Sequence, residues 1–160
     1  MQLALVAVGA LRPGFREMCD EYLRRLARYA RTTEHELKEA GRVPEGAPRR
    51  AEEAKRLRAA IPAGALVVAC ARAGDPWTSR DLATRLERWQ IAARPLAVLV
   101  GGSNGLDPDL IRSADHRWSL GPLTLPHELA RVVIAEQLYR AFTILKGEPY
   151  HKGKEGRGER

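Results

Sequence analysis

Three short apolar runs divide the chain, at residues 3–8, 65–71 and 96–100. Each has the length of a strand and leads into a turn, which is typical of strands buried on both faces of a sheet. Two shorter segments, 34–40 and 118–120, are predicted as an edge strand and as a short strand or extended stretch.

Segments with helical spacing separate these strands. In the first of them, Phe15, Met18 and Tyr22 recur at intervals of three or four residues, and arginines occupy the opposite face. The predicted helices are residues 15–29, 49–61, from a cap at Thr78 or Ser79 to about 90, from 107 or 108 to about 114, and 127–145. Because strands alternate with helices, the predicted fold class is α/β, with a parallel sheet covered on both faces.

The helix predicted at residues 127–145 is apolar on nearly every side. Its apolar positions are Leu129, Val132, Val133, Ile134, Leu138, Tyr139, Phe142, Ile144 and Leu145. Such a helix has to be covered on several sides. Two explanations are open: a second subunit covers one face, which favours a homodimer, or the helix lies deep in the core of one chain.

The charge balance favours a polyanionic partner. Lysine and arginine number 27 against 20 aspartates and glutamates, which gives a formal net charge of +7. Most of these cations are arginines, whose planar guanidinium pairs with two phosphate oxygens at once. Nucleic-acid binding is one interpretation, and a basic but merely solvated surface is the other.

Other features of the sequence bear on the cellular location of the protein. No apolar run is long enough to cross a bilayer, and the first residues lack the pattern of a signal peptide, so no membrane contact is predicted. Cys19 and Cys70 lie far apart and in no metal-binding motif, so neither a metal nor a disulfide framework is indicated. These features favour a cytoplasmic location.

Two glycine-bearing loops are the candidate ligand sites. Residues 101–105 follow a buried strand, at the position where ligands bind in open α/β sheets. Residues 121–126 precede a predicted helix, and their small and proline residues leave backbone groups available for a flat heterocycle. Taken alone, each loop is equally explained as an ordinary turn.

A second set of candidates lies near the C-terminus. Glu136 and Arg140 have the spacing of an ion pair on one helix, so Arg140 is either structural or presented to a substrate. Tyr150, His151 and Lys152 combine a ring, a titratable imidazole and a cation that could stack on, deprotonate or clamp a nucleotide. The alternative for this group is a solvated tail.

Taken together, several motifs carry a resemblance to a known family. They are residues 5–9 (LVAVG), 21–26 (EYLRRL), 99–106 (LVGGSNGL), 118–120 (WSL), 123–127 (LTLPH), 131–141 (RVVIAEQLYRA) and 149–152 (PYHK). This set resembles RlmH, a family of bacterial SPOUT-class methyltransferases that act on N3 of a pseudouridine in 23S ribosomal RNA. The resemblance extends nearly to Lys152.

The resemblance implies a fold, an assembly and a cofactor. The fold would be a parallel-sheet SPOUT methyltransferase domain over residues 1–152 with a C-terminal trefoil knot, and residues 153–160 would be a disordered tail. The protein would be a homodimer that binds S-adenosylmethionine and modifies 23S ribosomal RNA on the assembled ribosome. The implied cofactor-binding residues are Cys70, Ala71, Gly102, Gly121, Pro122, Leu123, Thr124, Leu125 and Pro126. Many relatives carry an acidic residue where Ala71 stands.

The resemblance and the chemistry of the acceptor together give a mechanistic hypothesis. The proton on N3 has to leave, so a general base or a cation that stabilises the anion is needed. His151 is the predicted base, Arg140 the cation and Tyr150 a stacking partner, and His151 would act on the cofactor of the other subunit. The competing hypothesis is a noncatalytic RNA-binding or ribosome-binding protein.

Overall fold

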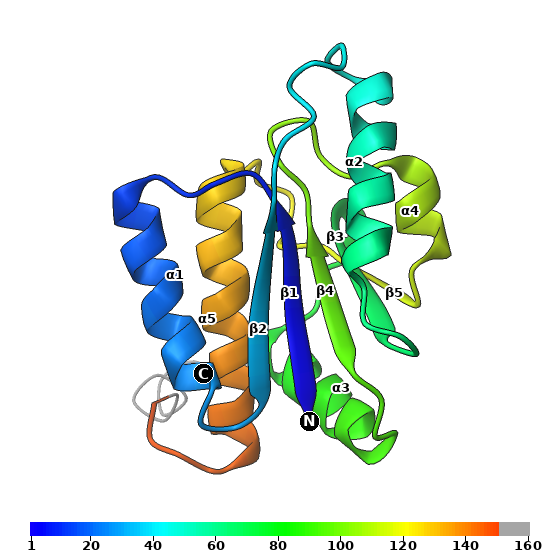
Figure 1. Ribbon diagram of the computed structural model, residues 1–160. Helices are drawn as coiled ribbons and strands as arrows, with labels where there is room; N and C mark the ends of the chain where they lie inside the picture. Colours follow the sequence, from blue (N-terminus) through cyan, green and yellow to red (C-terminus); the bar gives the residue numbers. More distant parts are fainter. Residues whose placement is uncertain (151–160) are drawn as a thin grey trace.

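The computed structural model describes residues 1–150 (Figure 1). The catalytic role predicted for His151 and the disorder predicted for residues 153–160 therefore concern residues outside the described part of the chain. The elements are β1 (Gln2–Val8), α1 (Pro13–Leu26), β2 (Arg31–Leu37), α2 (Ala47–Ala60), β3 (Leu66–Asp75), α3 (Ser79–Ile91), β4 (Leu96–Val100), α4 (Pro108–Ser113), β5 (His116–Trp118) and α5 (His127–Leu145).

The five strands form one parallel sheet in the order β2-β1-β4-β3-β5. The central strand β4 is buried along its whole length, as its run of five apolar residues predicts. The α/β class and the parallel sheet are thus confirmed.

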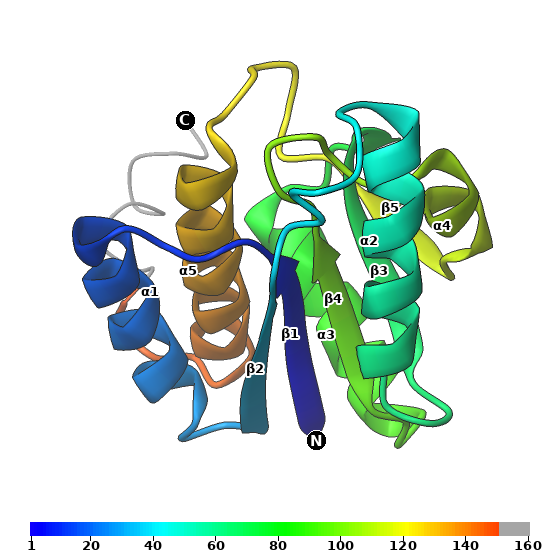
Figure 2. The ribbon, with the colours of Figure 1, turned by 45° about the horizontal axis from the view of Figure 1, so that its top comes forward.

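Alternate residues of β1 face opposite layers of helices. Leu3 and Leu5 pack in a core with residues of α3 and α5. Ala4 and Val6 pack in a second core with residues of α2 and α4. Figures 1 and 2 show the result, with α1, α3 and α5 on one face of the sheet and α2 and α4 on the other.

The edge strand β2 begins and ends three residues before the predicted segment 34–40. Ion pairs of Glu34 and Glu36 hold this strand in place, rather than the burial of apolar side chains. Arg131 is 1% exposed and lies 2.6 Å from Glu36 and 3.5 Å from Glu34. Arg16 contacts the same two carboxylates at 2.6 and 2.7 Å. These pairs join β2 to α1 and α5.

The long helix α5 has the predicted bounds and packs between α1 and α3 against the sheet. Much of its apolar surface is therefore covered within one chain, which was one of the two explanations open from the sequence. Ala135, Leu138 and Phe142 are almost fully buried. Among the helices of residues 1–150, none combines the length and apolar character needed to cross a bilayer.

Candidate functional site

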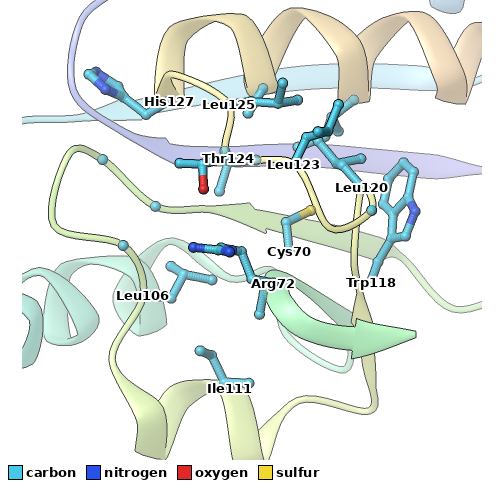
Figure 3. A pocket seen from close by; sticks show the side chains of 18 residues that line it. Cys70, Arg72, Leu106, Ile111, Trp118, Leu120, Leu123, Thr124, Leu125 and His127 are labelled. Carbon is cyan, nitrogen blue, oxygen red and sulfur yellow. The ribbon is translucent and has the colours of Figure 1, made fainter. Parts of the chain in front are cut away.

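A cavity of about 250 Å³ opens at the carboxyl ends of β3 and β4, against the first turns of α5 (Figure 3). Three separate parts of the sequence form its walls: the end of β3, the loop after β4, and the loop after β5 together with the start of α5 that follows it. Open α/β sheets bind ligands outside the carboxyl ends of their strands. The cavity therefore occupies the position of a ligand site, and we call it the pocket.

The loop after β4 gives the pocket a wall of bare backbone. A Cβ added to Gly101 would lie 2.7 Å from the carbonyl carbon of Gly105, so only glycine fits there. The Gly105 amide, at a φ of +76°, donates to the Gly102 carbonyl oxygen at 3.0 Å. Asn104 anchors the loop, because its Oδ1 accepts from the Gly46 amide at 3.0 Å. A ligand can approach this backbone closely.

The loop after β5 forms the facing wall. The Ser119 amide donates to the Asp75 carbonyl oxygen at 2.9 Å, and the Gly121 amide donates to Ser119 Oγ at 3.1 Å. Gly121 has a φ of +113°, which favours glycine. Beyond this turn Leu123 is 75% exposed, and Thr124 brings a hydroxyl to the pocket. The loop thus offers apolar cover together with a few polar groups.

The end of β3 lines the pocket with small side chains and one cation. Cys70 and Asp75 both pair with Trp118 of β5, so the residues between them bulge out of the ladder. Ala71 and Arg72 lie on this bulge and line the pocket. Burial raises the pKa of the Cys70 thiol to about 12, so the thiol is neutral near pH 7 and contributes an apolar wall rather than a nucleophile.

An aromatic cluster stands behind this wall. Trp118, which lines the pocket, stacks on Trp77 with ring centroids 5.8 Å apart. Trp89 lies 6.0 Å from Trp77 and 5.3 Å from His116, and Arg85 lies over Trp77 at 4.3 Å. Burial lowers the pKa of His116, which favours the neutral ring. These contacts fix the back of the pocket.

The start of α5 closes the remaining side. His127 borders the pocket, while Pro126 directly precedes the helix. Glu128 accepts from the Arg12 amide at 2.7 Å and from Arg12 Nε at 2.8 Å, and these bonds lower the pKa of the Glu128 carboxyl. The chain before α1 is thereby tied to the turn that presents His127.

The structure gathers most of the cofactor-binding residues predicted from the sequence around one cavity. Those that line it are Cys70, Ala71, Gly102, Gly121, Leu123, Thr124 and Leu125. Pro122 and Pro126 belong to the same loop without lining the cavity. The sequence analysis missed Arg72, Leu106 and Ile111, which also line it. The predicted strand 65–71 ends just before Arg72, and no local pattern in the sequence indicates the bulge that brings Arg72 to the pocket.

The residues predicted as catalytic lie elsewhere on the same chain. Arg140 is six residues beyond Ile134, the last residue of α5 that lines the pocket, which is about 9 Å along the helix. Arg140 contacts Glu136 at 2.6 Å and lies 4.9 Å from the centre of the Tyr150 ring. The Tyr150 hydroxyl donates to Glu136 at 2.9 Å. The two predicted residues therefore share one cluster with Glu136, apart from the pocket.

Protonation in this cluster favours a charged arginine and a neutral phenol. Burial works against the charge on Arg140, yet its hydrogen bonds to Glu136 raise its pKa above the usual value. Burial and the bond to Glu136 both raise the pKa of Tyr150. No group of three or more His, Cys, Asp or Glu side chains within residues 1–150 could hold a metal ion.

A parallel α/β sheet with a backbone-walled pocket at its carboxyl edge defines a class of proteins that bind small organic cofactors. Comparison with known proteins narrows this class. The family model described as "Predicted SPOUT methyltransferase" matches residues 1–151, and the chain belongs to this family. The expectation of a methyltransferase is thus confirmed, and family membership counts against the noncatalytic alternative.

Curated relatives match almost the whole chain. Two proteins named ribosomal RNA large subunit methyltransferase H are similar to it. The one from Pseudomonas putida strain F1 is 40% identical over 155 residues, and the one from Anaeromyxobacter dehalogenans strain 2CP-1 is 43% identical over 153 residues. Each match covers 95% of this chain and 100% of the relative.

A solved structure supports the fold. "A probable methylase family protein" from Haemophilus influenzae Rd KW20 is similar with a TM-score of 0.55 and 11% identity. The match covers 92% of this chain and 69% of that one. At this identity the likeness concerns the fold alone.

Proposed function

We propose that this protein transfers a methyl group from S-adenosylmethionine to N3 of a pseudouridine in 23S ribosomal RNA, on the assembled ribosome. The observation that carries the proposal is the match of the whole chain to ribosomal RNA methyltransferases, together with a pocket built from the residues expected to bind the donor. Methylation of large-subunit ribosomal RNA follows from the names of these relatives. Pseudouridine as the target base, N3 as the methylated atom and the assembled ribosome as the substrate are the more specific parts of the proposal.

The pocket residues suit an adenosine-containing donor. Its walls are mostly apolar, with Leu106, Ile111 and Leu125 available to cover a flat ring. The glycine positions at 101 and 102 leave no side chain between a ligand and the backbone, and a Cβ on Gly102 would already lie 3.1 Å from the Val8 side chain. Backbone amide and carbonyl groups of the two loops can then recognise polar edges of the heterocycle.

The bound donor supplies a methyl group activated on a sulfonium, so the protein has to orient the acceptor and manage one proton. Positioning contributes several kcal/mol, roughly, to such a reaction. Arg140 Nε and Nη2 both donate to one oxygen of Glu136, at 3.0 and 2.6 Å. This fixes the guanidinium with Nη1 directed away from these bonds, so it can stabilise the anion that N3 becomes.

The remaining catalytic assignments follow from the same cluster. Tyr150 is held by Glu136 and packs 4.8 Å from the Tyr139 ring, so it can stack on the target base. His151 is the proposed general base and follows Tyr150 directly in the sequence. We assign it the proton of N3, which it takes as the acceptor attacks the methyl group.

The distance between cluster and pocket on one chain supports a site shared by two subunits. In Figure 1, α5 runs from the edge of the sheet that carries the pocket toward the opposite edge, and the chain from residue 146 continues from that far end. In a homodimer, the cluster of one subunit can meet the pocket of the other. We accordingly propose a homodimer, as the resemblance to the family implies.

A trefoil knot is also part of the proposal. The chain around the pocket brings the loop after β4, the loop after β5 and the end of β3 together. The pairing of Trp118 with both Cys70 and Asp75 ties the last strand to β3 just before the chain enters α5. Close packing of two loops against the end of a strand is the arrangement that a knotted backbone would need.

Transfer of a radioactive methyl group tests the function. The purified protein is incubated with labelled S-adenosylmethionine and either assembled ribosomes, isolated large subunits, naked 23S RNA, or assembled ribosomes in which uridine replaces pseudouridine. We expect label in RNA only from assembled ribosomes that contain pseudouridine, at N3 of one nucleoside after digestion. Label in another base would correct the acceptor, and absence of label from every substrate would remove the proposed activity.

A further inference from the structure

Among residues 1–150, the pocket is lined by a single permanent cation and by no carboxylate. Arg72 is the one lysine or arginine among the described residues that line it, and no described aspartate or glutamate does so. The polar side chains that accompany it are Thr124, His127 and the neutral thiol of Cys70. The electrostatic character of this cavity is thus set by one guanidinium.

Arg72 is held in place by the backbone rather than by polar contacts of its own side chain. Within residues 1–150 its guanidinium forms no hydrogen bond or ion pair. The bulge between Cys70 and Asp75 turns this part of β3 out of the ladder, and such bulges redirect side chains beside binding sites. Gly74 makes the bulge possible, since a Cβ there would lie 2.7 Å from the Arg117 backbone. In Figure 3 the guanidinium points toward the side of the pocket formed by Leu106 and Thr124, next to Cys70.

The charges on the methyl donor of the proposed function indicate which part of the donor faces Arg72. Besides the adenosine, the donor has a sulfonium, an ammonium and a carboxylate. No acidic side chain of the described pocket can take the two cations, whereas Arg72 can pair with the carboxylate through two hydrogen bonds. The adenosine is then left for the apolar walls deeper in the pocket.

We propose that Arg72 binds the carboxylate of the donor's amino-acid part and so sets the direction in which the donor lies. This inference rests on the proposed function, because it assumes that the pocket takes S-adenosylmethionine. The alternative source of an oxyanion is a phosphate of the RNA, which would reach the same exposed guanidinium from outside.

Calorimetric titration of Arg72→Gln with two ligands tests the proposal. S-adenosylhomocysteine carries the carboxylate, and 5′-methylthioadenosine shares the adenosine and the thioether but lacks the amino acid. We expect the variant to bind S-adenosylhomocysteine about tenfold more weakly and 5′-methylthioadenosine as the original protein does. The matched control is Arg31→Gln, which removes an exposed arginine at the start of β2, the opposite edge of the sheet.

The outcomes separate this inference from the proposed function. If the original protein binds neither nucleoside, the proposed cofactor is wrong. If it binds both and Arg72→Gln weakens both equally, or neither, the carboxylate contact is wrong. Unchanged binding of both nucleosides, combined with a higher RNA concentration for half-maximal methylation, would assign Arg72 to an RNA phosphate instead.

Discussion

At the scale of single residues, the shape of the pocket depends on a glycine that has no Cβ. Gly101 has no room for a Cβ, because the nearest neighbours are backbone atoms of Gly105 and Leu106 at 2.7 and 2.9 Å. Backbone cannot rotate aside as a flexible side chain can. The wall can therefore keep its shape only with glycine at position 101, and even alanine there is expected to change it.

Gly101→Ala is expected to abolish or strongly weaken donor binding. The added methyl group has to push the loop after β4 outward, at a cost of roughly 1–3 kcal/mol in unfolding free energy, as for other overpacked sites. Calorimetry with S-adenosylhomocysteine and urea unfolding measure the two effects. Gly14→Ala is the matched control: it lies in α1 with nothing within 4 Å of the new Cβ, so binding should not change and stability should stay equal or rise slightly. Undiminished binding by Gly101→Ala would contradict the backbone wall.

Arg131 shows how one buried charge joins separate elements. Its Nη2 donates to the Gly9 and Val8 carbonyl oxygens at 2.5 and 3.2 Å, while Nη1 donates to Glu36 at 2.6 Å. Arg131→Met keeps much of the volume but removes the side-chain donor to the Gly9 and Val8 carbonyl oxygens and leaves Glu36 with Arg16 alone. Urea unfolding should show a loss of about 3 kcal/mol.

The control for this prediction is an exposed pair of the same chemistry. Arg24, whose side chain is 70% exposed, pairs with Glu21 on the surface of α1. Arg24→Met should change the free energy of unfolding by less than about 1 kcal/mol. Equal losses in the two variants would mean that burial of Arg131 does not matter to its contribution.

At the scale of elements, the sequence predicts regular apolar segments well and irregular ones less well. The bounds of β4 and α5 agree with their prediction, because β4 is apolar from Leu96 to Val100 and α5 begins directly after Pro126 and ends at the apolar Leu145. The start of β2 was missed, since its residues alternate between exposed and half-buried and rely on ion pairs with Arg16 and Arg131. No local pattern shows that arginines on two distant helices hold this strand.

The site residues likewise divide into those that a local sequence pattern predicts and those that depend on the pairing of distant strands. Both glycine-bearing loops could be predicted from sequence, because glycines after a buried strand indicate a close approach of the backbone. That they face one cavity with Cys70 depends on the strand order, which brings β3 beside β4. Arg72 could not be predicted as a pocket residue, because the bulge that presents it arises from the pairing of two residues of β3 with Trp118.

The docking of α3 against β5 is expected to weaken in acid. His116 packs against both Trp77 and Trp89. Burial lowers the pKa of His116, an effect that Arg85 and Arg117 strengthen and that Asp115 and Asp75 oppose. The unfolded chain, with a pKa near 6.5, then binds more protons than the folded one just below that pH. The stability contributed by the neutral ring is present above pH 6.5 and is lost as the pH falls through the lower pKa of the folded state.

Thermal unfolding between pH 7 and pH 5 measures this dependence. His116→Phe should keep the ring packing and show a smaller fall in melting temperature toward acid than the original protein. His35→Gln, at an exposed position of β2, should show the same fall as the original protein. A pH dependence that His116→Phe leaves unchanged would assign the effect to other groups.

At the scale of the whole molecule, the pocket and the cluster of Glu136, Arg140 and Tyr150 occupy different stretches of α5. Ala130 and Ile134 line the pocket, and the cluster begins two residues further along the helix, at Glu136. The helix separates the pocket from Arg140 within one chain, because each residue adds about 1.5 Å along the helix axis. Arg140 is six residues beyond Ile134, which is about 9 Å along this axis. We therefore propose that Arg140 acts at the pocket of another subunit.

Mixed dimers test this proposal directly. Ala130→Phe should fill the pocket of one subunit, and Arg140→Ala should remove the cation from the other, so each variant alone is expected to be inactive. If sites are shared, a dimer of the two variants has one intact site, formed by the pocket of one and the cluster of the other. A random one-to-one mixture should then recover roughly a quarter of the original methylation activity, because half of the dimers are mixed and each has one site of two. Light scattering must first show that both variants remain dimeric, and calorimetry that Arg140→Ala still binds S-adenosylhomocysteine. A mixture that stays as inactive as its components, although mixed dimers form, would contradict the shared site and would require Arg140 either to act in its own subunit or to have no catalytic role.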